Sequence, residues 1–196
     1  MITIESAAGL KATLSRSGLT TFLNRARVAV GLAGEVEVLL SDDRTLRRLN
    51  RSFRGKNKST DVLSFPTPAE ISHTHAGDLA ISLETAARQA ATYGHSLRDE
   101  VKILLLHGVL HLSGLDHETD NGEMAASEAA LRHQLRLTTD SLTERATKLP
   151  LKSSSHAAKK KPSSPKKVRA TSKKSPSIRA IKKVSMANKK TARGSK

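Results

Sequence analysis

Three histidines in the second half of the chain, His107, His111 and His117, have the residue type and spacing of a metal site. His107 and His111 are four residues apart, so on a helix they share one face, with Cβ atoms about 5–6 Å apart. Two imidazoles at that separation can both bind one ion at about 2.0–2.1 Å. Gly114 is placed to end the helix in a left-handed conformation and to return the chain. The spacing therefore predicts that His117 joins the other two histidines at one ion.

The donor set indicates which metal the site would hold. The chain contains no cysteine, so thiolate ligands and disulfides are both excluded. Three neutral imidazoles suit Zn²⁺ and leave its fourth tetrahedral position open to water, as in catalytic zinc sites. We therefore predict one Zn²⁺ ion in a site where water can be activated near neutral pH. No role is assigned to the other histidines, His73, His75, His95, His133 and His156.

The residue after the first histidine limits the chemistry. The pattern H-x-x-x-H-x-x-G-x-x-H is also that of the metzincin peptidases, in which a glutamate at this place is the general base. Here it is Gly108, which has no side chain to accept a proton, so ordinary zinc-peptidase chemistry is disfavoured. Glu118 or Asp120 could replace that base in a peptidase or amidohydrolase. Asp116 could orient an imidazole, shuttle a proton or cap the turn after the helix.

A basic segment lies upstream of the histidines. Between residues 47 and 58 there is no acid, and five cations fall on one side of an expected helix and in the loop after it: Arg47, Arg51, Arg54, Lys56 and Lys58. Arginine offers a planar fork of donors that matches phosphate oxygens, so the segment suits a phosphate-rich substrate. The alternative is that these residues only keep a surface helix and loop soluble. Gly55 would let the backbone turn sharply and aim Arg54 inward.

Strands and helices alternate around these residues. Strands are expected at residues 2–5, 35–40, 61–65 and 78–83. Helices are expected at residues 10–32 with a candidate break at Gly18, after the cap Ser41-Asp42-Asp43 through Leu49, at 84–93, at 97–112 behind the cap Ser96, and at 123–137. The helix at 97–112 is apolar on most sides and should be buried. We predict an α/β fold, a single domain with a small mixed four-stranded sheet packed by about five helices.

The formal charge of +16 is concentrated in the last quarter of the chain. Residues 1–147 hold 17 Lys and Arg against 18 Asp and Glu, whereas residues 148–196 hold the other 17 basic residues and no acid. The second part is rich in Lys, Ser, Pro and Ala, so it can bury too little to offset the entropy of ordering. We predict a domain at 1–147 and a disordered tail at 148–196. The tail should bind polyanions, unless it is only a solubilising extension.

Neither a secretory leader nor a membrane span is expected. The first residues lack a basic start followed by an apolar run, and no stretch approaches about 18 apolar residues. We therefore expect a cytoplasmic protein that does not enter a membrane.

Three motifs together resemble the YbeY family of bacterial endoribonucleases, over residues 1 to about 140. They are L-N-x-x-F-R-x-K-x-x-x-T-D-V-L-S-F-P, G-D-L-A-I-S and H-G-x-L-H-L-x-G-x-D-H. The resemblance implies a single-strand-specific, zinc-dependent endoribonuclease acting in 16S rRNA 3′-end maturation and ribosome quality control. Its partners would be single-stranded RNA, rRNA and the ribosome or its small subunit. The tail departs from the family, whose members typically end near the last helix.

The same resemblance implies roles for individual residues. His107, His111 and His117 would be the zinc ligands, and Arg54 and His107 would act in catalysis. Two other functions stay open at this point. One is a metzincin-like metallopeptidase or amidohydrolase, and the other is a non-enzymatic ribosome-associated RNA-binding factor in which zinc only holds the fold. A structural zinc normally takes four protein ligands, and the sequence offers three.

Overall fold

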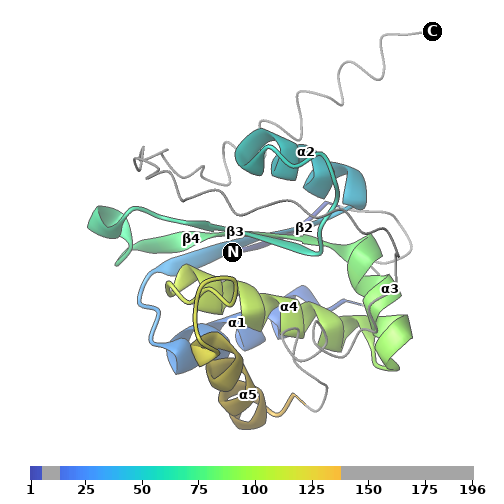
Figure 1. The fold of residues 1–196 in the computed structure, drawn as a ribbon. Coiled ribbons are helices and arrows are strands. Elements are labelled where there is room, and N and C mark those ends of the chain that lie inside the picture. The colour runs from blue at the N-terminus through green and yellow to red at the C-terminus, as the bar shows by residue number, and fades with distance from the viewer. Residues whose placement is uncertain (6–13, 138–196) are drawn as a thin grey trace, which may run out of the picture.

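A mixed four-stranded sheet forms the centre of the structure, a computed structural model that describes residues 1–5 and 14–137 (Figure 1). The strands are β1 (Ile2–Ile4), β2 (Glu35–Ser41), β3 (Val62–Pro66) and β4 (His75–Ser82). Their order in the sheet is β1-β2-β4-β3. β1, β2 and β4 run parallel, while β3 pairs antiparallel with β4. β3 is therefore an edge strand.

Helices cover both faces of the sheet. They are α1 (Arg16–Val30), α2 (Asp43–Arg54), α3 (Leu83–Tyr93), α4 (Leu97–Leu112) and α5 (Glu123–Leu135), with one 3₁₀ turn at Ala69–Ile71. In Figure 1, α2 lies on one face of the sheet, and α1, α4 and α5 lie on the other. No helix in the described part of the chain is long and apolar enough to cross a bilayer.

The two faces of β2 explain its apolar sequence. Val38 and Leu40 belong to the large core beneath α1 and α4, whereas Leu39 packs in a second cluster with Leu46 and Leu49 of α2. A strand that is buried on both faces reads as a continuous apolar run rather than a strict alternation. The predicted fold class is confirmed: one α/β domain with a mixed four-stranded sheet and five helices in the described residues.

The helix expected at residues 10–32 starts later than predicted. α1 begins at Arg16, because the Ser15 hydroxyl caps the helix by accepting the Gly18 N–H at 3.2 Å. Gly18 therefore lies in the first turn and does not break the helix. Residues 6–13 and the predicted tail at 148–196 lie outside the described residues.

Other boundaries also differ from the expected ones. α2 runs on to Arg54, beyond the expected Leu49. β3 continues through Pro66, which an edge strand tolerates because one side of its backbone needs no partner. β4 starts at His75 rather than residue 78, since its first residue already pairs with Glu35 of β2. α5 ends at Leu135 instead of residue 137, because Arg136 takes a left-handed conformation with φ 59°.

α4 is buried on most of its sides, and it approaches β4 closely at Gly108. A Cβ atom at this position would lie 2.7 Å and 2.9 Å from the two methyl carbons of Leu79. Leu79 is a β4 residue with no exposed surface, so it has little room to move away. A residue without a side chain at position 108 lets the helix lie this close to the sheet.

We expect Gly108→Ala to lower the free energy of unfolding by about 1–3 kcal/mol, the usual cost of overpacking a core. In an open helix the same change would stabilise by about 1 kcal/mol. Gly18→Ala in α1 is the matched control, because its Cβ would meet only the Ser15 side chain, with Oγ at 3.4 Å and Cβ at 3.6 Å. Urea unfolding measures both variants. The Leu79→Val variant lacks the two methyl carbons that would clash. Gly108→Ala should therefore lower the free energy of unfolding less in that variant than in wild type, and an equal loss would contradict this account.

Candidate functional site

The structure brings His107, His111 and His117 together at one end of α4. Their ring centroids are 4.8, 5.2 and 5.3 Å apart, and each ring offers a nitrogen within 4.8 Å of the others. The Nε2 atoms of His107 and His111 face each other at 3.2 Å. This arrangement could hold a metal ion. Within the described residues the group comprises these three side chains and no fourth ligand.

The turn after α4 places His117 beside the two helical histidines. The helix ends with the cap residue Ser113, and Gly114 follows with a φ of 96° in the left-handed region. Asp116 then holds the next turn, because its carboxylate accepts the Glu118 N–H at 3.1 Å. Of the roles considered for Asp116, capping the turn is the one that its hydrogen bonding shows.

His111 is held in the neutral form, which is the one that binds metals. Burial lowers the pKa of His111 below its ordinary value of 6.5, and the nearby His107 and His117 lower it further. The charge of Asp116 and a backbone hydrogen bond with Leu115 act in the opposite direction without reversing the shift. At neutral pH this ring therefore has a free lone pair.

Glu128 of α5 contacts the histidine cluster and was not predicted. Its side chain is completely buried, and its Oε2 lies 3.4 Å from Nδ1 of His107. The sequence carries a signal that could have found it: α5 buries Met124, Glu128, Arg132 and Leu135, so a carboxylate stands in the row that faces the core. Acidic residues are almost never fully buried without a partner.

The two carboxylates considered as replacements for the peptidase base, Glu118 and Asp120, differ from each other in their surroundings. A Cβ atom at position 108 would clash with Leu79, so the packing of α4 against β4 leaves no room for a glutamate side chain there. Asp120 accepts the N–H groups of Gly122 and Met124 at 2.9 and 2.7 Å, and these bonds lower its pKa. Asp120 thus bonds to backbone N–H groups at the start of α5. Glu118 is exposed and lines the cleft described next.

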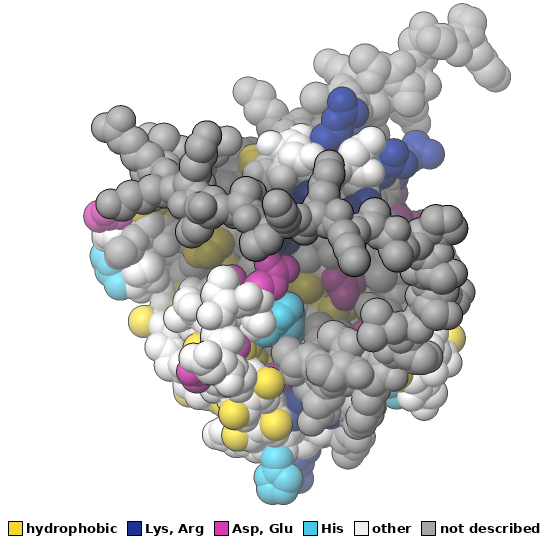
Figure 2. Space-filling model, viewed as in Figure 1, with side chains coloured by type: hydrophobic (Ala, Val, Ile, Leu, Met, Phe, Trp, Pro, Cys, Tyr) yellow, Lys and Arg dark blue, Asp and Glu magenta, His cyan; other side chains and the backbone are white. Residues whose placement is uncertain are grey.

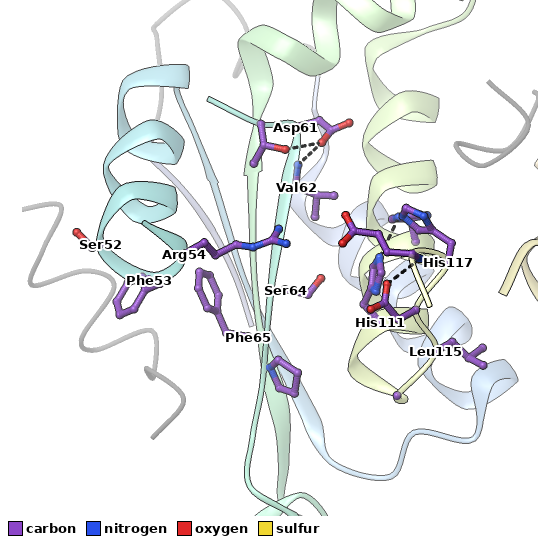
Figure 3. A pocket seen from close by; sticks show the side chains of 16 residues that line it. Ser52, Phe53, Arg54, Asp61, Val62, Ser64, Phe65, His111, Leu115 and His117 are labelled. Atoms are coloured by element: carbon purple, nitrogen blue, oxygen red, sulfur yellow. Dashed lines mark hydrogen bonds between the residues drawn. The ribbon is translucent and has the colours of Figure 1, made fainter. Parts of the chain in front are cut away.

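A cleft of about 670 Å³ opens beside the histidines. One wall is the end of α4 with the turn after it, and the other is the last turn of α2 with the edge strand β3. In Figure 3 the Arg54 side chain extends from the end of α2 toward the histidine side of the cleft. Ser64 belongs to the wall that contains β3, and its hydroxyl donates to the carbonyl oxygen of Gly108 in α4 at 3.5 Å.

The end of α2 directs Arg54 into this cleft. Gly55 has a φ of 70°, and its N–H bonds to carbonyls of the last turn, which stops the helix directly after Arg54. The buried Asn50 side chain then donates to the Lys58 carbonyl at 2.8 Å and folds the following loop back. The inward turn that the sequence predicted at Gly55 is therefore present.

The other cations of this segment remain on the surface. Figure 2 shows Lys and Arg side chains gathered over α2, and the exposed ones include Arg44, Arg47, Arg51, Lys56 and Lys58. Of the five cations that the sequence singled out, Arg54 is the one that lines the cleft.

The remaining described histidines lie outside the lining of the cleft. His95 Nε2 is 2.5 Å from the buried carboxylate of Glu100, and His75 Nε2 is 3.1 Å from Asp78. His73 and His133 are exposed. His156 lies outside the described residues.

We expect the ring of His111 in metal-free protein to titrate below 6.5, because its surroundings disfavour the charged form. Unfolded chains would then bind more protons than folded ones as the pH falls through about 6.5, so stability should fall in that window and level off below the folded pKa. An NMR titration of the ring measures the midpoint, and urea unfolding measures the stability. A midpoint at or above 6.5 would contradict the lowered pKa of His111.

Comparison with known proteins points to one family. A family model described as Endoribonuclease YbeY matches residues 6–136. A Koribacter versatilis protein named Endoribonuclease YbeY is 53% identical over 137 residues, which cover 70% of this chain and 88% of that protein. Proteins with the same name are 48% identical in Nautilia profundicola, covering 53% of this chain and 73% of theirs, and 47% identical in Solibacter usitatus, covering 65% and 84%. The chain therefore belongs to the YbeY endoribonuclease family.

Proposed function

We propose that this protein is a zinc-dependent endoribonuclease that cleaves single-stranded RNA in the cleft between α2 and α4. The observation that carries the proposal is that three histidines and one arginine, from opposite walls, meet in the same cleft. His107, His111 and His117 would hold the ion, and neutral imidazoles without a thiolate suit zinc. When bound, Zn²⁺ supplies a Lewis acid for the phosphodiester group.

Arg54 is the residue proposed to bind the phosphodiester from the other wall. Its guanidinium can donate two parallel hydrogen bonds to phosphate oxygens and can stabilise the charge that develops on them during cleavage. The left-handed Gly55 and the tethered loop after it restrict how the end of α2 can move. The cap keeps the backbone of Arg54 beside the cleft, and its exposed side chain can reach a phosphate group there.

Two aromatic rings beside Arg54 support single-stranded RNA as the substrate. Phe53 and Phe65 both line the cleft and pack edge to face, with centroids 5.3 Å apart and planes at 72°. Phe65 is buried, whereas Phe53 is 36% exposed. Unpaired bases stack on exposed aromatic rings, but bases inside a duplex keep their faces covered. An exposed ring next to a phosphate-binding arginine therefore favours an unpaired strand.

The biological role that we propose follows from the family. Its relatives are named endoribonucleases, and the motifs of this chain resemble those of proteins that mature the 3′ end of 16S rRNA and act in ribosome quality control. The small ribosomal subunit would then be the partner, in the cytoplasm. The exposed cations over α2, next to the cleft, suit contacts with an RNA backbone.

Replacing the cleft residues should separate metal binding from phosphate binding. His107→Ala should remove both bound zinc and cleavage of a single-stranded RNA oligonucleotide. Arg54→Ala should keep the zinc but slow cleavage by about 10²–10³-fold, the usual cost of losing one donor to a developing charge. Gel assays give the rates, and metal analysis gives the zinc content. His133→Ala and Arg25→Ala, exposed on α5 and α1 and outside both the cleft lining and the basic surface over α2, are the matched controls.

The same preparations distinguish the alternative functions. Wild-type cleavage of RNA but not casein supports the endoribonuclease, and the reverse result would support a peptidase that uses Glu118. Zinc binding without cleavage of either substrate would favour the RNA-binding factor. Unchanged RNA cleavage by His107→Ala would rule out a mechanism centred on the metal.

The basic segment at residues 148–196 is proposed to bind polyanions in addition to the cleft. Deleting it should weaken RNA binding at low salt and reduce the salt dependence, because fewer phosphate charges are neutralised. Cleavage of a short oligonucleotide at saturating concentration should stay at the wild-type rate. Loss of that cleavage would show that the division between a domain and a separate tail is wrong.

A further inference from the structure

We infer that Glu128 is a positioning residue for the metal site, acting through His107. Its carboxylate would accept the Nδ1 proton of His107 and so direct the Nε2 lone pair of that ring to the ion. This inference rests on the proposed function, since it takes the three histidines to be metal ligands. It adds a residue from α5 to a site otherwise built from α4 and the turn that follows it.

The orientation of the His107 ring carries the inference. Nδ1 faces Oε2 of Glu128 at 3.4 Å, and Nε2 faces the Nε2 atom of His111 at 3.2 Å. A neutral imidazole has a single N–H, so a proton held at Nδ1 leaves Nε2 as the metal-binding atom. Ligand histidines usually donate their second nitrogen to a carboxylate, a carbonyl or water, which fixes both the tautomer and the ring angle.

The burial of Glu128 also supports a role at the metal site. Glu128 has no exposed surface, and His107 is only 5% exposed. An ion held by three neutral imidazoles would keep its two positive charges, and a carboxylate buried behind His107 would offset part of them. Glu128 would do so without being one of the three candidate ligands.

A second buried pair provides the comparison. His95 and Glu100 lie together at the other end of α4, with Nε2 and Oε2 2.5 Å apart, and Glu100 also has no exposed surface. His95 is not part of the histidine cluster. Both pairs contribute to packing around the same helix, but only Glu128 contacts a ring whose second nitrogen faces another proposed ligand.

The test compares Glu128→Gln with Glu100→Gln. Both variants keep the size of the side chain and remove its charge. We expect Glu128→Gln to weaken zinc binding by roughly 10–100-fold, the usual effect of losing such a partner, and Glu100→Gln to leave the zinc affinity unchanged. Competition with a chromogenic chelator measures the affinity, and urea unfolding of the metal-free proteins shows that each variant is folded.

NMR of zinc-loaded wild-type protein gives a readout that does not depend on a variant folding. Nitrogen-15 shifts and long-range couplings of the His107 ring should show a proton on Nδ1 and zinc on Nε2. Zinc on Nδ1, or equal losses of zinc affinity in the two variants, would overturn the inference. If wild type and Glu128→Gln bind zinc equally well, Glu128 has no positioning role although the proposed function stands. If wild type binds no zinc, the proposed function itself fails.

Discussion

The burial of α4 among the sheet and the helices α1, α3 and α5 is the constraint on which the rest of the site depends. The helix presents Gly108 to Leu79 of β4, and it carries His107 and His111 toward the cleft. A helix surrounded by close-packed side chains cannot rotate or slide without creating cavities or clashes. The direction of the two imidazoles is therefore set by the whole core. The same close approach gives Gly108 a packing role and leaves no place for a peptidase base at that position.

The cleft joins the two faces of the sheet across its edge. α2 lies on one face and α4 on the other, and in the part of the chain that the structure describes the edge strand β3 runs between these two helices (Figure 3). The start of β3 is fixed by Asp61, whose carboxylate accepts the Val62 N–H at 2.8 Å and the Gln89 amide of α3 at 3.0 Å. A substrate in this cleft can contact residues from both helical layers because, among the described residues, no further strand lies beyond β3.

Local sequence signals predicted which helices and strands form better than they predicted where each one begins and ends. The cap at Ser96 and the apolar run behind it placed α4 correctly, because a cap and a buried helix are both local patterns. β4 was predicted three residues short at its start. Its first three residues, His75, Ala76 and Gly77, do not form an apolar pattern. They are in a strand because His75 and Gly77 pair with Glu35 and Val36 of β2, with a shift of register between the two pairs. Pairing with a distant strand is decided by the sheet, not by the residues themselves.

The sequence by itself determined that His107 and His111 share a helical face and that Gly114 lets the chain return with His117. These relations depend on backbone geometry within a few residues. The fixed rise and turn of a helix make that geometry predictable. The sequence also showed that Arg54 directly precedes Gly55, where the chain can turn.

Only the tertiary structure decided what surrounds these groups. Glu128 is 21 residues from His107, and it reaches Nδ1 only because α5 packs beside α4. Arg54 faces the histidines because α2 and α4 flank the same edge strand. Contacts between distant segments depend on how apolar faces are buried together, and spacing along the chain carries no record of that arrangement.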